Sequence, residues 1–215
     1  GAFRDDRPHG EGILTYSPDA EGLIKGAVYE GAFIDGLPHG SGKITYRDGS
    51  SYSGDWDAGV IEGQGTARYA DGLIYDGEFV AGQNHGSGRL IATDGYVYDG
   101  AWNDGVREGA GIATYPDGTR YEGNFADGEP SGPGRMTMPG GQILEGTWQN
   151  GTLSGQGRAV YGNGDVYEGT FADGRPEGQG RMDFADGAVY EGLWADGQPV
   201  GAPSAAGAAT VAPEG

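Results

Sequence analysis

A period of 23 residues, kept without a single insertion, constrains this chain more than any other feature. The triplet Tyr-x-Gly begins at Tyr29 and again at Tyr52, and a large aromatic residue follows each glycine by two positions. Eight copies keep this spacing, and Phe and Trp alternate strictly at the last position. A sustained period of this length indicates a repeat architecture, in which each unit packs mainly against its neighbours.

The repeated positions give two sets of structural residues. The aromatic set predicts a ladder that is first a core and, where it is exposed, a binding groove: Tyr29, Phe33, Tyr52, Trp56, Tyr75, Phe79, Tyr98, Trp102, Tyr121, Phe125, Trp148, Tyr167, Phe171, Tyr190 and Trp194. The glycine set is Gly31, Gly54, Gly77, Gly100, Gly123, Gly146, Gly169 and Gly192. Leu144 replaces the tyrosine of the sixth triplet.

Each unit continues with a Gly-x-Gly pair and ends with Asp-Gly, as at Asp48-Gly49. Asp-Gly between short alternating runs favours a tight hairpin turn, because that turn needs positive φ. We expect strands near 29–33 and 42–46 in the first full unit, joined by a loop of roughly six to eight residues over 35–40. The predicted fold is all-β: an elongated, single-layer antiparallel sheet of tandem β-hairpins, curled into a trough by strand twist.

Alternate residues of a strand share a face. Tyr29, Gly31 and Phe33 therefore point one way, and glycine leaves room beside each ring for a ring from the neighbouring strand. The opposite face is expected to be polar. An acidic residue such as Glu30 stands inside most Tyr-x-Gly triplets and a basic one such as Lys43 follows Gly-x-Gly. These residues predict acidic and basic columns with weak cross-strand ion pairs.

The repeat also predicts the organisation of the chain. Residues 1–201 form the array, with a partial first repeat, a longer connection over 17–25, full repeats from 29 and a half repeat over 190–201. Residues 202–215, rich in Ala, Gly and Pro, are expected to be a flexible tail. An upstream signal or anchor, and a further domain, stay open.

Composition restricts the partners. The formal charge is −19, with 32 acidic and 13 basic residues. This balance disfavours nucleic acid and anionic membrane surfaces, and favours solubility or a basic partner. Cysteine is absent, which excludes disulfides and thiolate metal sites. No apolar run is long enough to span a bilayer. Compartment stays unknown, and eleven Arg against two Lys are typical of a GC-rich bacterial genome.

The units YEGAFIDGLPHGSGKITYRDGSS and YEGNFADGEPSGPGRMTMPGGQI resemble MORN repeats, whose pattern is Y-x-G-x-W/F, then G, then G-x-G, an aromatic residue and D-G. The resemblance covers residues 1 to about 201. It implies a single-layer sheet of hairpins with a role in scaffolding, protein–protein contact or dimerisation, and phospholipid binding has been proposed for the family. The motif is structural and transfers no catalytic residue.

Sites of chemistry are not expected. His9, His39 and His85 share one repeat position and are predicted to lie roughly 10 Å or more apart, too far for a shared metal. The acidic residues cannot share a calcium ion for the same reason. No glycine pair matches a phosphate-binding loop, and no nucleophile–base–acid set recurs. We therefore predict no catalytic, metal or cofactor site and no enzyme activity.

Three functions remain open. The first is a scaffold that binds a protein partner or itself through an extended sheet surface. The second is a peripheral membrane or phospholipid-binding module, which the negative charge disfavours. The third is carbohydrate or cell-wall recognition, although only four Trp are present for sugar stacking.

Overall fold

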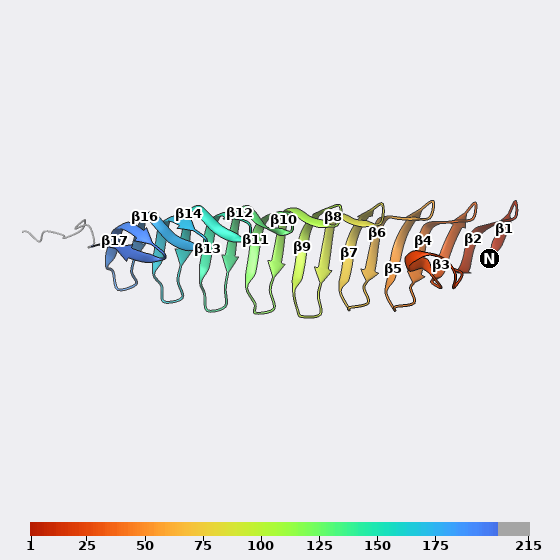
Figure 1. The fold of residues 1–215 in the computed structure, drawn as a ribbon, viewed down its shortest axis with the longest axis horizontal. Helices are drawn as coiled ribbons and strands as arrows, with labels where there is room; N and C mark the ends of the chain where they lie inside the picture. The colour runs from red at the N-terminus through yellow and green to blue at the C-terminus, as the bar shows by residue number, and fades with distance from the viewer. Residues whose placement is uncertain (202–215) are drawn as a thin grey trace, which may run out of the picture. The chain divides into compact units, whose positions relative to one another are not determined.

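The computed structural model describes residues 1–201 and divides into two compact units, residues 1–116 and the part from residue 117 onward. In each unit, consecutive strands pair antiparallel in chain order and form one layer (Figure 1). The prediction of an all-β, single-layer sheet of tandem hairpins is confirmed. The predicted tail, 202–215, lies outside the described residues. Within 1–201 no helix has the length and apolarity to span a membrane.

The first unit contains ten strands and one short 3-10 helix. They are β1 (Ala2–Arg4), β2 (Arg7–Thr15), η1 (Gly22–Ile24), β3 (Val28–Ile34), β4 (Leu37–Thr45), β5 (Ser51–Asp57), β6 (Val60–Arg68), β7 (Ile74–Val80), β8 (Gln83–Ile91), β9 (Val97–Asn103) and β10 (Val106–Thr114). The segment predicted as a longer connection lies between β2 and β3 and contains η1.

The second unit contains the remaining described strands. They are β11 (Arg120–Ala126), β12 (Glu129–Thr137), β13 (Ile143–Gln149), β14 (Thr152–Val160), β15 (Val166–Ala172), β16 (Arg175–Asp183), β17 (Val189–Ala195) and β18 (Gln198–Val200). Strands of seven and nine residues alternate here as in the first unit, except that β18 has three residues.

The lengths of the two connections are the reverse of those predicted. The segment expected as a loop over 35–40 is a two-residue turn at Asp35-Gly36, and β4 already begins at Leu37. Both turn residues have positive φ, 51° and 90°, which the tight primed turn requires. The Asp48-Gly49 pair, expected as the tight turn, instead lies in a five-residue link, where the Tyr46 amide donates to the Ser50 carbonyl at 2.9 Å.

A bulge explains why the strand after the tight turn begins earlier than the predicted 42–46. In the β3–β4 hairpin, Gly31 pairs with Gly42 and Phe33 pairs with Pro38, so the register shifts between them. Gly40 lies in the extra segment with φ 67°, a conformation that glycine adopts without strain. Gly40, which the sequence predicts to lie in a loop, is therefore part of a bulge inside a nine-residue strand.

Backbone hydrogen bonds also join neighbouring hairpins at the tight turns. The Gly36 amide donates to the Pro8 carbonyl at 2.9 Å, and Gly59 donates to Pro38 at 2.8 Å. The same bond recurs in the second unit, where Gly174 donates to Leu153 at 3.0 Å. Within each of the two compact units, neighbouring hairpins are thus joined at their turns as well as through their strands.

Candidate functional site

The predicted aromatic ladder lies in the core of each unit. The ring of Tyr29 contacts Phe33 of its own hairpin and Trp56 of the next, each with 5.1 Å between ring centroids and nearly perpendicular planes. Tyr52, Tyr75, Tyr121 and Tyr167 repeat the arrangement. Edge-to-face pairs of this kind stabilise beyond the area they bury. The fifteen ladder rings are at most 7% exposed, so the ladder itself offers almost no open surface.

The tyrosine rings lie over the glycines of their own hairpins, so glycine leaves room for a ring from the paired strand, as Gly42 does for Tyr29. A Cβ atom added at Gly42 would lie within 2.6 Å of three atoms of the Tyr29 ring. The hydroxyl of Tyr29 donates to the Ala32 carbonyl at 3.0 Å, which folds the ring back along its own strand. Burial, followed by the nearby charge of Glu11, raises the pKa of Tyr29 to about 12.

The sixth triplet, which carries Leu144, departs from this arrangement. The equivalent glycine on its partner strand is Gly157, and the ring beside it is Phe171, with a Cβ atom there lying 3.1 Å from that ring. The glycine position is therefore far less crowded where the tyrosine is absent.

The alternation of Trp and Phe has a structural consequence. The indole Nε1–H of Trp56 donates to the Gly42 carbonyl of the preceding hairpin at 3.2 Å, and Trp148 donates to Gly134 at 3.0 Å. Trp102 and Trp194 make the same bond. Phenylalanine has no donor, so this indole–carbonyl hydrogen bond belongs to the junctions that carry Trp, which are every second one.

A comparison with known families matches the MORN repeat nine times along the chain, at residues 1–19, 29–51, 52–74, 75–95, 98–120, 121–143, 145–166, 167–189 and 190–202. The chain belongs to the MORN-repeat family. Among curated proteins nothing matches.

Solved structures with a similar fold are distant in sequence. The G-box domain of the microcephaly protein CPAP, described with a suggested role in centriole elongation, aligns at a TM-score of 0.51 and 14% identity, over 85% of this chain and 92% of that chain. The TCP domain of SAS-4 from Drosophila melanogaster, solved with a proline-rich motif of Ana2, aligns at a TM-score of 0.40 and 15% identity, over 71% and 77% of the two chains. At such identities the likeness shows the fold alone.

The MORN hairpins carry a second set of rings that the sequence did not single out as a site. These rings stand at the five-residue links on the same face as the ladder. Around Tyr46 and Tyr69 they leave a cavity of about 510 Å³ above Ala67, here named the Ala67 cavity. Its lining is Tyr46, Asp48, Ser50, Ser51, Tyr52, Ile61, Ala67, Arg68, Tyr69, Ala70, Asp71, Phe79 and Gly82.

The opposite face of the second unit carries the predicted charges in one row of alternating sign. Register places Arg158 between Glu145 and Glu168, and Arg181 between Glu168 and Glu191. Arg158 bonds Glu168 at 3.0 Å and Arg181 lies 4.0 Å from Glu191, with side chains about half exposed. Such exposed pairs contribute little stability. The row borders a shallow hollow of about 620 Å³ on the glycine backbones.

In the first unit the same face is not uniformly polar, contrary to the prediction. Five aliphatic residues flank the tight turns of four consecutive hairpins and are 42–49% exposed. By strand alternation they point away from the rings. We name them the aliphatic stripe: Ile34, Leu37, Val60, Val80 and Val106. The flanking positions of the second unit hold mostly smaller or polar residues, among them Ala126, Glu129, Gln149, Thr152, Ala172 and Arg175.

Two of the three histidines pair with carboxylates of the next hairpin. His39 Nδ1 lies 3.2 Å from Asp57 and His85 Nδ1 lies 3.6 Å from Asp104. Within residues 1–201 no group of three or more His, Asp or Glu side chains has the geometry to hold a metal ion.

Proposed function

We propose that this MORN array is a non-catalytic scaffold that binds a protein partner on the face opposite the rings. One observation carries the proposal: the aliphatic stripe stands exposed on that face of the first unit, at 42–49% of each side chain. A row of exposed aliphatic side chains is typical of an interaction surface.

The division of labour among the residues supports this proposal. The repeated aromatic and glycine residues have structural roles. Tyrosines and glycines pack within each hairpin, and Phe or Trp packs against the neighbouring hairpin. Residues that differ between copies, such as those of the aliphatic stripe, lie on the exposed face. A partner that distinguishes one part of the array must contact these positions, because the repeated aromatic residues are buried.

Charge specifies the chemistry of the partner. Carboxylates stand close to the aliphatic stripe in the sequence, among them Asp35, Asp57 and Asp104, and the whole chain carries −19. A partner with aliphatic residues set among Lys and Arg would complement this surface, and long-range attraction would speed its association. We favour such a protein over an anionic lipid surface, which the same charge repels.

The test is capture of partners from the source organism with the wild-type chain and with a triple variant, Leu37→Gln, Val60→Thr and Val106→Thr. We expect a partner that binds the wild type when both are purified, and that binds the triple variant at least tenfold more weakly. Val189→Thr, which alters an exposed valine of the second unit, is the matched control and should leave binding unchanged.

Membrane binding, sugar recognition and self-association each predict a different experimental result. Sedimentation with phosphoinositide vesicles would place the chain at a membrane, and retention on a glycan array would favour sugar recognition. A concentration-dependent mass in light scattering, lost in the triple variant, would make the partner a second copy of the chain. A monomer that captures no protein would refute the scaffold proposal.

A further inference from the structure

The Ala67 cavity exists because two side chains that could fill it are small or short. Ala67 stands where the neighbouring hairpins have Ile44 and Leu90. Ile61, which pairs with Trp56 across the β5–β6 hairpin, borders the cavity. Four rings form its walls: Tyr46, Tyr52, Tyr69 and Phe79.

The chain contains the filled counterpart of this cavity 46 residues further on. There Ala113 replaces Ala67 and Tyr98 replaces Tyr52. Arg107 stands in place of Ile61, and Tyr96 and Ala92 stand in place of Ser50 and Tyr46. Arg107 pairs with Trp102 as Ile61 pairs with Trp56, so the two side chains start from the same point of the hairpin.

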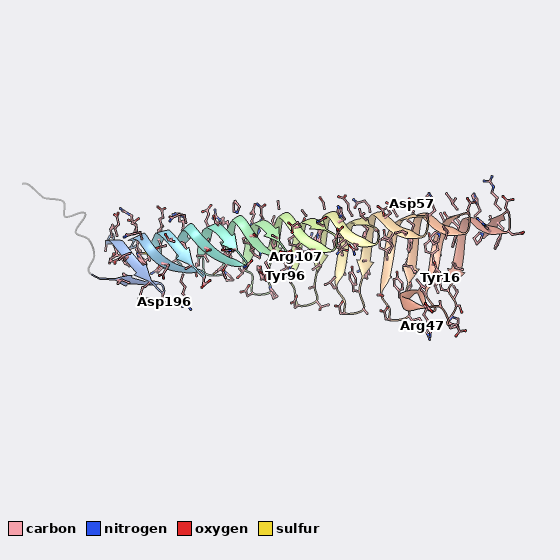
Figure 2. All side chains as sticks on the ribbon, turned by 45° about the horizontal axis from the view of Figure 1, so that its top comes forward. Tyr16, Arg47, Asp57, Tyr96, Arg107 and Asp196 are labelled. Carbon is pink, nitrogen blue, oxygen red and sulfur yellow. The ribbon has the colours of Figure 1, made fainter. Side chains whose placement is uncertain are left out.

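In that counterpart a cation occupies the space over the rings. The guanidinium carbon of Arg107 lies 5.5 Å from the ring centroid of Tyr96 and 5.7 Å from that of Tyr98, within the range of cation–π attraction. Arg107 also donates a hydrogen bond to the Tyr96 hydroxyl. Figure 2 shows these two side chains beside each other. Ala113 is 0% exposed beneath them, whereas Ala67 is 8% exposed.

The charges at the mouth of the Ala67 cavity also favour a cation. Asp48 and Asp71 border it, and hydrogen bonds from Ser50 lower the pKa of Asp48 so that it is ionised at neutral pH. Arg68 is the cation in the lining, but it follows Ala67 in β6 and therefore points to the opposite face. Aromatic walls with carboxylates at the rim attract a cation that has an apolar stem.

We infer that the Ala67 cavity binds an arginine side chain supplied by a partner, in the place that Arg107 fills within the chain one double repeat later. This inference rests on the proposed function for the source of the arginine. It adds that the partner makes a contact on the ring face as well as on the aliphatic stripe.

The test uses a small probe, N-acetyl-arginine N-methylamide, and its neutral citrulline analogue. We expect saturable binding of the arginine probe, seen as chemical-shift changes confined to residues of the cavity lining. The citrulline analogue should bind about fivefold more weakly or worse, the ratio that ~1 kcal/mol of cation–π attraction gives.

Two variants should close the cavity with side chains that stand at the equivalent positions of other hairpins. Ile61→Arg copies the Arg107 hairpin, and Ala67→Leu copies the Leu90 hairpin; each should weaken the arginine probe at least tenfold while cooperative unfolding is retained. Thr66→Arg adds the same charge one residue before Ala67 in β6, on the opposite face, and should change binding less than twofold.

Equal binding of the arginine and citrulline probes, unchanged binding to Ile61→Arg, or no saturable binding to the wild type would each overturn the inference. Because the probe experiment needs no partner protein, it fails or succeeds independently of the partner-capture experiment.

Discussion

Replacing one half-buried glycine, Gly180, should destabilise the array far more than replacing its equivalent in the neighbouring hairpin. A Cβ atom at Gly180 would lie within 2.5 Å of three atoms of the Tyr167 ring. That ring cannot move aside, because it is 0% exposed, packs against Phe171 and Trp194 at 5.1 and 5.0 Å, and donates to the Thr170 carbonyl at 3.0 Å.

The size of the effect follows from what Gly180→Ala displaces. Expelling the Tyr167 side chain gives up ~2 kcal/mol of burial, ~1 kcal/mol for its hydrogen bond and ~1 kcal/mol for each of two ring pairs. Complete loss is therefore ~5 kcal/mol, and partial displacement of the strand lowers the cost to no less than ~3 kcal/mol. We expect Gly180→Ala to reduce the free energy of unfolding by ~3–5 kcal/mol in urea titrations followed by tryptophan fluorescence.

Gly157→Ala is the matched control. Gly157 occupies the same repeat position, but its triplet carries Leu144, and the added Cβ would lie 3.0 Å from the Glu145 carbonyl oxygen and 3.1 Å from the Phe171 ring. A shift of a few tenths of an ångström relieves those contacts, and alanine restricts the unfolded chain, so the change should stay within ~1 kcal/mol.

A third comparison tests whether the Tyr167 ring or the backbone causes the loss of stability. Tyr167→Leu alone copies the natural Leu144–Gly157 pair, and on this background adding Gly180→Ala should cost no more than ~1 kcal/mol. Equal losses for Gly180→Ala and Gly157→Ala, or no relief from Tyr167→Leu, would show that the ring is not what the glycine accommodates.

Three further predictions follow from turns, hydrogen bonds and titration. Ala58 and Ala81 hold φ of 46° and 50° in tight turns where other hairpins have Asp or Asn, so Ala58→Asn and Ala81→Asn should each raise unfolding free energy in urea by ~0.5–1 kcal/mol. Trp148→Phe removes the bond to Gly134 and part of a buried ring, and calorimetry should show a loss of ~1–2 kcal/mol. Burial raises the pKa of Tyr29, Tyr52, Tyr98 and Tyr167 to about 12, so the unfolded chain ionises first; stability should be intact below pH ~10 and fall by ~1.4 kcal/mol per pH unit for each tyrosine up to pH ~12, measured by tyrosinate absorbance and urea titration.

The positions of the strands and rings could be predicted from the sequence because the period fixes them independently of loop detail. Tyr29, Gly31 and Phe33 recur at one spacing, and only a stacked hairpin keeps every copy in register. The direction of the tyrosine ring could not be predicted. Strand alternation gives the face of a side chain, but a hydrogen bond to the carbonyl three residues on decides that the ring folds over its own glycine.

The prediction of the connection lengths was wrong for a local reason. Asp35-Gly36 and Asp48-Gly49 are the same dipeptide, so turn propensity cannot distinguish them. The choice is made by the strand that follows: Gly40 permits a bulge and keeps β4 paired from Leu37 onward. In two other copies the tight turn holds Ala58-Gly59 and Ala81-Gly82, so the Asp-Gly dipeptide that predicts a tight turn is absent from the actual turn.

The Ala67 cavity could not be predicted because a repeat pattern describes what copies share, and the cavity comes from what they do not share. Ile61 and Arg107 hold one position in two hairpins, and both satisfy the packing against Trp. Arg107 reaches over the rings of Tyr96 and Tyr98, whereas Ile61 is shorter and Ser50 stands in place of Tyr96, so the cavity beside Tyr52 stays open. Under the proposed function we expect a partner to distinguish one hairpin from the next through such substitutions, because they alter the surface without altering the buried ladder beneath it.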